Sequence, residues 1–479
     1  MIAPHKARSG RIFYTVTVFV VLASVDNTAA ALYPVLTNVI ADDFGADTTR
    51  VASVTALVIL VAALTAVAWG YFGDRSSRKP LLFWATLVWC AGLLLASRSS
   101  SLTEFAIWSA LFAIGLGAIA SVGFSVISDF ISPRRRGLAM SFWGLSQGIG
   151  GFVGLLVGGV AGASDWRRPF VGIALVGIVF ALLYLTTAEA PRGRSEPELA
   201  EALASGGVYN FRIKKSDLPM LFRTRTNPWL ILQGLTAQLA YGSLIWVPLL
   251  FQGKVEADGY DLATATAVGA VFGALFQLGG LASILSGHLG DRLQLRTPRA
   301  RALISSTGIL GAIPFFVAFF FIPIRGLDIP ADQGSLAIVL GTLRSVFTNP
   351  YVGAAFLLCL VAVVLTSADS PNWFALISDV NLPEHRGTIY GIANLSNGLS
   401  RAVGNGLTVP VAGLLATGFG TPLNYAIGLA LFQVFFIPTG LCYWKASRTC
   451  GDDLARVRAV LAERGRQALE DTSTSSEDG

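Results

Sequence analysis

The sequence predicts an all-α membrane protein in which twelve transmembrane helices form two pseudo-symmetric six-helix halves. An apolar composition and a duplicated pair of motifs lead to this fold class. The chain has 479 residues, of which 53% are hydrophobic and 13% are charged, and its mean hydropathy is +0.62. Because soluble domains carry roughly 25% charged residues, this composition indicates a chain that crosses the membrane many times.

Twelve apolar segments are long enough to span the bilayer, since a transmembrane helix needs roughly 20 mostly apolar residues. Each is expected to be a helix because lipid cannot satisfy the hydrogen-bonding groups of an open backbone. The first is too long and begins too late for a signal peptide, so we expect it to remain in the membrane. The predicted spans are about 12–39, 50–73, 80–97, 102–128, 137–162, 168–188, 227–252, 262–287, 300–323, 351–378, 388–415 and 421–444.

The distribution of Lys and Arg predicts the orientation. With the N-terminus inside the cell, most of the 35 basic residues fall in segments that face the cytoplasm, as the positive-inside rule requires. We therefore expect a multi-pass protein of the cell (inner or plasma) membrane with both termini cytoplasmic. The formal net charge of +6 does not indicate nucleic-acid binding, because the basic residues lie in short clusters between apolar runs.

Two motifs each occur twice, in the same order. "GYFGDRSSRKP" begins at Gly70 and "GHLGDRLQLRTPR" at Gly287, while "SDFISPRRRG" begins at Ser128 and "SDVNLPEHRG" at Ser378. The duplication predicts two parallel halves, which is the arrangement of one large class of secondary transporters. The predicted divisions are an N-terminal half over 1–189, a cytoplasmic linker over 190–226, a C-terminal half over 227–445, and a cytoplasmic tail over 446–479 that starts as a short helix and ends disordered.

These motifs resemble those of the major facilitator superfamily over essentially the whole chain. Within that superfamily, "VDN" in the first span and "GYFGDRSSRKPLLF" resemble the Spinster-like branch, whose members move lysophospholipids and sphingoid lipids. This chain has Asn27 where that branch usually has an arginine. The resemblance implies the major facilitator fold and transport by alternating access around a site near the middle of the membrane.

The duplicated motifs are predicted to form a cytoplasmic latch. Gly70 and Gly73 permit the close approach of another helix, and Asp74 can accept hydrogen bonds from the free N–H groups of a helix N-terminus. The resemblance implies that this neighbour is the helix that begins near Gly387, with a mirrored contact in the second copy. Positive-inside anchoring is the alternative role of the basic residues. The predicted latch residues are Gly70, Gly73, Asp74, Arg75, Arg78, Asp129, Arg136, Gly287, Asp291, Arg292, Asp379 and Arg386.

Charged residues predicted at membrane depth are costly and usually serve a function. Asp26, in the first span, is predicted to bind a proton or to neutralise an amine of the substrate. The alternative is a structural carboxylate satisfied by Asn27. Asp369, in the tenth span, is consistent with gating, proton relay or packing, and the nearby Pro371 predicts a kink.

Arg401 lies on a polar stripe of the eleventh span with Asn394, Asn397 and Asn405, at helical spacing. Such a stripe is unsuited to lipid and is predicted to face a central cavity, where a guanidinium binds phosphate or carboxylate. The alternative is a buried partner for one of the two acids at membrane depth. Further predicted cavity residues are Gln147, Gln233, Gln238, Tyr241 and Trp373.

The sequence contains no pattern that predicts a metal, a cofactor or an ATP site. The four cysteines and three histidines lack metal-ligand spacing, and no phosphate-binding loop is present. An intramembrane enzyme would need clustered His, Asp, Ser or Cys at one depth, and the sequence predicts no such cluster. We therefore expect a protein that is not an enzyme and that uses an ion gradient or the gradient of its substrate.

The function predicted from the sequence is secondary active transport, coupled to protons, of a small or amphiphilic solute such as a lysophospholipid. A multidrug or organic-anion/metabolite efflux transporter of the same fold is one alternative, and a non-transporting membrane sensor is an alternative of another class. The expected partners are membrane lipid, the substrate and protons, without nucleic acid. The protein is expected to be a monomer.

Overall fold

All the regular secondary structure in the described part of the chain is helical. The computed structural model describes residues 3–477 except 47, 124, 127–128, 130, 132, 139, 142–147, 152, 155–156, 158–164, 189–194, 202–210, 262–263, 266–267, 270, 273–281 and 331–334. Within those residues there is no β-strand. An all-helical chain is what a lipid environment demands, because each helix satisfies its own backbone.

The N-terminal part of the chain forms one bundle. Its helices are α1 (Ala3–Val35), α2 (Thr37–Phe44), α3 (Thr48–Arg75), α4 (Arg78–Ala96), α5 (Leu102–Ala118) with a π-helical turn η1 (Ile119–Gly123), the 3-10 turn η2 (Pro133–Arg135) and α8 (Arg167–Thr186). The connection to the second bundle contains η3 (Pro197–Leu199), η4 (Lys215–Asp217) and α10 (Leu218–Arg223).

The C-terminal part forms a second bundle. It contains α11 (Asn227–Ser243), η5 (Leu244–Trp246), α12 (Val247–Ala257), α14 (Ser283–Gln294), α15 (Ala300–Phe321), α16 (Ser335–Thr348), α17 (Pro350–Thr366), α18 (Asp369–Val380), η8 (Pro383–His385), α19 (Arg386–Leu415), α20 (Leu423–Gln433) and α21 (Phe436–Glu477). The sequence did not predict α16, which lies between the ninth and tenth spans.

Among the described residues, nine helices are long and apolar enough to cross a membrane. They correspond to all the predicted spans except the fifth, eighth and eleventh. The eleventh span is present as α19, a 30-residue helix that carries the polar stripe. Most of the fifth span (137–162) and much of the eighth (262–287) fall outside the described residues. The fold is therefore the predicted all-helical membrane fold.

Several predicted spans are broken in two near a proline. The tenth span divides between Thr366 and Asp369, two residues before Pro371, where the sequence predicted a kink. The missing N–H of a proline and the clash of its ring with the preceding turn explain such a break. Pro314 and Pro410 nevertheless lie inside α15 and α19, so proline alone does not decide where a helix is interrupted.

The last helix is longer than predicted. It runs as one helix from Phe436 to Glu477, through the predicted boundary at 445 and most of the predicted tail. Outside the apolar span, Val457 and Leu461 are buried against Leu199 of η3. This apolar contact with the linker stabilises a segment whose composition alone indicated a short helix and a disordered end.

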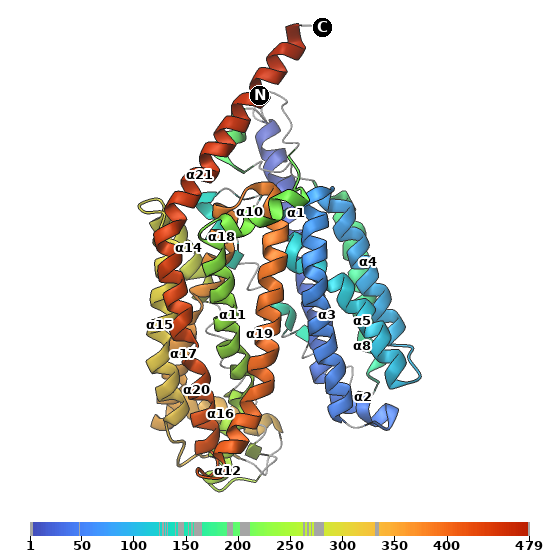
Figure 1. Cartoon of the computed structure of the whole chain (residues 1–479). Helices are drawn as coiled ribbons and strands as arrows, with labels where there is room; N and C mark the ends of the chain where they lie inside the picture. The colour runs from blue at the N-terminus through green and yellow to red at the C-terminus, as the bar shows by residue number, and fades with distance from the viewer. Residues whose placement is uncertain are drawn as a thin grey trace.

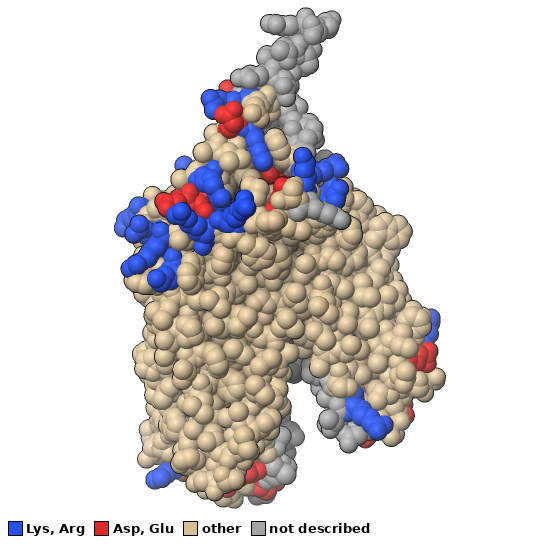
Figure 2. Space-filling view, in the orientation of Figure 1, with Lys and Arg blue, Asp and Glu red and all other residues tan. Residues whose placement is uncertain are grey.

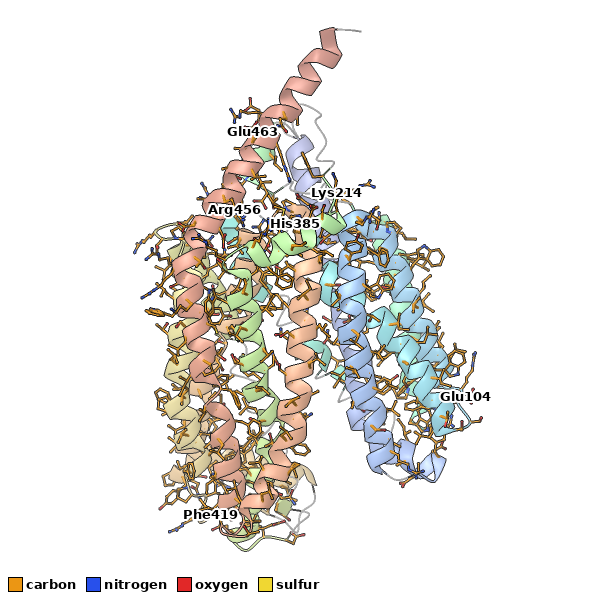
Figure 3. All side chains as sticks on the ribbon, in the orientation of Figure 1. Glu104, Lys214, His385, Phe419, Arg456 and Glu463 are labelled. Carbon is orange, nitrogen blue, oxygen red and sulfur yellow. The ribbon has the colours of Figure 1, made fainter. Side chains whose placement is uncertain are left out.

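The two bundles meet at one end of the molecule and separate at the other (Figure 1). Both termini lie at the end where the bundles meet, and Lys and Arg gather there on the face seen in Figure 2. We call it the charged end. At the opposite end, which we call the open end, Figure 2 shows a wide notch between the two lobes. Glu104 of one lobe and Phe419 of the other mark their tips, far from His385 and Lys214 at the charged end (Figure 3).

Candidate functional site

At the charged end, an acid from each bundle caps a helix of the other. Asp74, near the end of α3, accepts hydrogen bonds from the N–H groups of Gly387 (3.0 Å) and Thr388 (2.6 Å) in the first turn of α19. Asp291 of α14 accepts from the N–H groups of Gly137 (2.8 Å) and Leu138 (2.9 Å). The first N–H groups of a helix have no partner within it and carry the positive end of its dipole. The contact expected between Asp74 and the helix beginning near Gly387 is therefore present, with its mirrored copy.

Glycines let the two backbones touch at these caps. A Cβ on Gly70 would lie 2.2 Å from the carbonyl oxygen of Gly387. A Cβ on Gly287 would lie 2.4 Å from the carbonyl oxygen of Gly137. Both contacts cross between the bundles and leave no room for a side chain. Gly73 differs, because a Cβ there would meet Val122 of the same bundle, 2.7 Å away.

A crossed set of ion pairs surrounds the first cap. Arg78 of α4 pairs with Asp129 at 2.6 Å. Arg386 of the other bundle reaches the same carboxylate at 3.4 Å. All three side chains are buried. Buried charges of this kind are tolerated only when they are paired.

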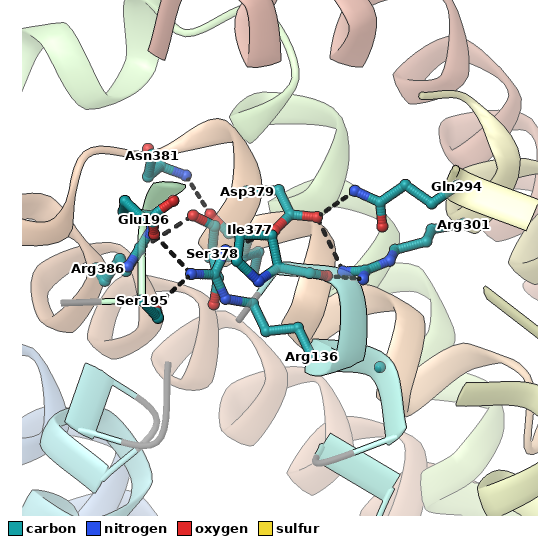
Figure 4. A network of polar contacts seen from close by, with 12 residues as sticks. Arg136, Ser195, Glu196, Gln294, Arg301, Ile377, Ser378, Asp379, Asn381 and Arg386 are labelled. Carbon is teal, nitrogen blue, oxygen red and sulfur yellow. Dashed lines mark hydrogen bonds and ion pairs between the residues drawn. The ribbon is translucent and has the colours of Figure 1, made fainter. Parts of the chain in front are cut away.

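The second cap has the equivalent set, shown in Figure 4. Arg136 pairs with Asp379 of the other bundle at 2.6 Å. Arg301 of α15 pairs with Asp379 at 2.9 Å and also with the cap residue Asp291 at 2.7 Å. The sequence did not single out Arg301, because it lies ten residues after Asp291 whereas Arg78 lies four residues after Asp74. Only folding places these two arginines in equivalent positions.

Glu196 of the linker joins the two sets. Its Oε1 accepts hydrogen bonds from Arg136 and from Arg386, both at 2.6 Å (Figure 4). Burial alone would raise the pKa of the Glu196 carboxyl, but the two guanidinium groups outweigh this effect and lower that pKa to about 2. Glu196 was missed because it stands in a charged stretch that reads as a solvated connection. The one feature of the sequence that could have indicated a shared acidic partner is that Arg136 and Arg386 occupy equivalent positions of the duplicated motif.

Two predicted latch residues lie outside this network. Arg75 is exposed and donates to the hydroxyl of Tyr71 at 2.9 Å. Arg292 is also exposed. We use the word latch below for the two capping acids, the crossed ion pairs and Glu196.

The helix α19 carries an exposed cationic side chain that has no ion-pair partner among the described residues. Arg401 is exposed and makes no ion pair or side-chain hydrogen bond within the described part of the chain, and in particular none to Asp26 or Asp369. It follows Gly398 by three residues on the same face of α19. A Cβ on Gly398 would lie 2.9 Å from the Cβ of Ala63 in α3, so this face of α19 is directed at the other bundle.

The asparagines of the predicted stripe are all half-buried. The amide of Asn397 packs on α11, where a Cβ on Gly234 would lie 2.1 Å from its Oδ1. That oxygen has no hydrogen-bond partner among the described residues. Asn405 contributes its backbone carbonyl, which accepts from the indole of Trp246 at 2.9 Å. Asn394 also lies on the α19 stripe.

Asp26 of α1 is buried, with 2% of its surface exposed. Its Oδ1 accepts a hydrogen bond from the amide of Asn27 at 3.0 Å. The amide nitrogen of Asn27 also donates to the carbonyl of Ala23 at 2.8 Å. No cation pairs with Asp26 in the described structure, so an anionic carboxylate here would be poorly compensated.

Asp369 is the centre of a polar cluster in the C-terminal bundle. Its carboxylate accepts from Gln233 (3.1 Å) and Tyr241 (3.3 Å) of α11, and from the hydroxyl of Tyr443 in α21. The fold thus joins three predicted cavity residues. Tyr443 was missed because it precedes Trp444 at the end of a span, where aromatic residues usually anchor the membrane interface.

The remaining predicted cavity residues are less central. Trp373 is buried, and its indole donates to the carbonyl of Leu230 at 3.1 Å. Gln238 of α11 is half-buried, and its Oε1 has no hydrogen-bond partner in the described part. Gln147 lies outside the described residues.

Comparison with known proteins identifies the family. The family model of the Major Facilitator Superfamily matches residues 18–405. The chain belongs to this superfamily. Its members are transporters rather than enzymes, in agreement with the prediction. The motif pairs that form the latch therefore lie within a shared family architecture.

Curated relatives support the resemblance to Spinster proteins. The chain is 27% identical over 335 residues to protein spinster homolog 3 of Danio rerio, covering 65% of each chain. It is 26% identical over 266 residues to the sphingosine-1-phosphate transporter SPNS2 of Mus musculus, covering 52% of this chain and 47% of that protein. The matched part thus spans about half to two thirds of the length of these relatives.

Solved structures share the fold. The XylE proton:xylose symporter bound to 6-bromo-6-deoxy-D-glucose superposes with a TM-score of 0.63 at 15% identity, covering 91% of this chain and 96% of that one. A bacterial homolog of the human lysosomal transporter Spinster, in an inward-facing and unoccupied conformation, gives a TM-score of 0.56 at 19% identity, covering 92% and 98%. At these identities the similarity establishes the fold.

Proposed function

We propose that this protein is a proton-coupled secondary transporter that moves a lysophospholipid or a related amphiphile by alternating access. The observation that carries the proposal is the combination of a closed latch at one end with an open notch at the other (Figures 1 and 2). A protein that only senses a ligand has no need for two mirrored, separable closures. Alternating access needs a closure that breaks when the bundles rock.

The proposed orientation places the charged end in the cytoplasm of a cell (inner or plasma) membrane. Most of the 35 Lys and Arg residues would then be on the cytoplasmic side, in keeping with the positive-inside rule. In this orientation the structure is outward-open. The two capping acids and Glu196 would hold it so, and they would separate when the protein opens inward.

The proposed substrate class rests on Arg401 and on the relatives. An exposed guanidinium without an ion-pair partner among the described residues offers a bidentate contact to a phosphate or carboxylate. One relative is named as a sphingosine-1-phosphate transporter, and such a substrate combines a phosphate with an apolar chain. An organic anion is the second candidate, because Arg401 would bind its charge equally well.

Coupling to protons is assigned to Asp26 in this proposal. The carboxyl is buried and has no cationic partner among the described residues, so a charged form there would be poorly compensated without another partner. A proton taken up from one side and released to the other would drive the cycle. An amine of the substrate is the other cationic group that could occupy the same position.

The test is a thermal-shift experiment on purified protein with lysophospholipids, sphingoid phosphates and small organic acids, because a ligand of the native state raises its apparent stability. Lysophospholipid should stabilise the wild type and not Arg401→Ala. The matched control is Arg98→Ala. Arg98 is exposed and follows the C-terminal end of α4, whereas the latch residue Arg78 is at the N-terminal end of that helix. Stabilisation by organic acids alone would replace the amphiphile with the second candidate. Equal stabilisation of Arg401→Ala would remove the assigned role of Arg401.

A flux measurement in proteoliposomes distinguishes transport from sensing. A proton-coupled transporter moves the stabilising ligand across the membrane when a pH gradient is imposed, whereas a sensor binds the ligand without moving it. Binding without flux would therefore overturn the proposed function.

A further inference from the structure

We propose that Asp369 is a second proton-binding site, located in the C-terminal bundle at the break between α17 and α18. This inference rests on the proposed proton-coupled function, which it deepens by assigning one titrating carboxyl to each bundle. It concerns a residue for which the sequence left gating, relay and packing open.

Among the described residues, the surroundings of Asp369 contain hydrogen-bond donors and no cation. Tyr241, Tyr443 and Gln233 all direct a donor at its carboxylate. The titratable groups that face it are the phenols of Tyr241 from α11 and Tyr443 from α21, and no Lys, Arg, Asp or Glu acts on it among the described residues. A carboxylate that carries structural charge would be expected to have a cationic partner, as four acids of the latch do: Asp129, Asp291, Asp379 and Glu196.

The cluster can also accommodate the protonated form. The hydroxyl of Tyr241 lies 3.3 Å from Oδ2 of Asp369 and 3.4 Å from the carbonyl oxygen of Thr366. When the carboxyl gains a proton, Tyr241 can turn its hydrogen to that carbonyl. Both protonation states of Asp369 are then hydrogen-bonded without any movement of a helix.

An acceptor without a partner lies next to the carboxyl. The Oε1 of Gln233 has no hydrogen bond within the described structure, and 2% of the Gln233 surface is exposed. A buried polar atom without a partner costs free energy. A protonated Asp369 could donate to this oxygen after a turn of the amide, which would replace the bond donated by Nε2 with one accepted by Oε1 and keep the two side chains bonded in either state.

The position of Asp369 links protonation to the helix break. It is the first residue of α18, and the carbonyls of the two preceding residues are held by side chains. Ser286 donates to Ser367 at 3.0 Å, and Ser305 donates to Ala368 at 3.1 Å. The turned hydroxyl of Tyr241 would strengthen its 3.4 Å contact with Thr366, the last residue of α17, so the proton state changes the bonding on both sides of the break.

Infrared difference spectroscopy on purified protein, with pH as the only variable, tests the site without any substrate. Acidification of the wild type should add a carboxylic-acid carbonyl band that is missing in Asp369→Asn and still present in Asp26→Asn. Asparagine keeps the size of the side chain and an acceptor oxygen, which makes it a matched replacement. Identical difference spectra of wild type and Asp369→Asn would overturn the proposal.

Two further measurements keep the test decisive. If Asp369→Asn does not fold, Tyr241→Phe replaces it: loss of a donor to the carboxylate should move protonation to higher pH by about one unit. An unmoved transition would contradict the proposal. Removal of the band by sodium chloride at constant pH would indicate a cation site instead of a proton site. The two proposals can fail separately. If Asp26→Asn keeps proton-driven flux while the infrared band assigned to Asp369 is still observed, the coupling role of Asp26 is refuted and the proton site at Asp369 is retained.

Discussion

The charged end and the membrane core of this protein treat buried charge in opposite ways. At the charged end, Asp129, Asp379 and Glu196 each contact two arginines. In the core, Asp26 and Asp369 have only uncharged partners among the described residues, and Arg401 has no ion pair there. Paired charges stabilise one arrangement of the two bundles, whereas charges without an ionic partner remain available to bind a proton or a charged group of a substrate. The difference separates the closure from the residues proposed as binding sites.

The largest expected effect comes from an unpaired acid of the core. Asp26→Asn should reduce proton-driven flux in proteoliposomes to background while leaving substrate exchange intact, because the amide cannot carry a proton through the cycle. Asp42→Asn is the control, since Asp42 is an exposed acid of α2. Full proton-driven flux in Asp26→Asn would show that the unpaired charge is not the coupling site.

Removal of the paired acid Glu196 should have a smaller effect, measured on the equilibrium between the closed and the open charged end. Glu196→Gln removes one charged contact from each of two buried arginines, which keep Asp379 and Asp129. We expect the closed charged end to lose about 2 kcal/mol relative to the inward-open form, a change of roughly thirtyfold in the equilibrium.

The reporter for that equilibrium is Ser141→Cys. Ser141 is buried where the bundles meet, and its hydroxyl donates to the carbonyl of Ser283 at 2.8 Å, while the four native cysteines are buried as well. Labelling of the new thiol should accelerate in Glu196→Gln. The matched control is Glu198→Gln, two residues along the linker, because the one ion pair of Glu198 among the described residues is a 3.7 Å contact with Arg458. Equal acceleration in both variants would contradict a specific role of Glu196.

The smallest expected effect is that of pH on the latch. Because the pKa of Glu196 is lowered to about 2 from an ordinary value of about 4.3, its stabilisation is fully present above about pH 4.3 and is lost as the pH falls through about 2. The factor by which Glu196→Gln accelerates labelling at Ser141→Cys, measured in an Asp26→Asn background, should therefore be the same at every pH between about 5 and 8. A change of that factor within this range would show that the paired charges also titrate.

Much of this architecture could be predicted from the sequence, because its signals are local or repeated. Apolar runs longer than the bilayer thickness determine helices whatever their neighbours. The duplicated motifs identified Asp74 and Asp291 as acids near a helix N-terminus, since an aspartate at a membrane edge has few other uses. The break near Pro371 likewise has a local signal in the sequence, although Pro314 and Pro410 lie within unbroken helices.

The tertiary structure decided which charges meet. Arg301 and Glu196 belong to the latch although neither occupies a repeated position, and Arg75 and Arg292 are outside it although both do. Tyr443 completes the Asp369 cluster, although its position beside Trp444 at the end of a span indicated an aromatic anchor at the membrane interface. A charge interacts with whatever lies within a few ångströms in space, and separation along the chain does not determine that distance. Sequence alone therefore determined the helices and the kinds of residue available for a site, and only the packing of the two bundles determined which of them are paired and which stay free.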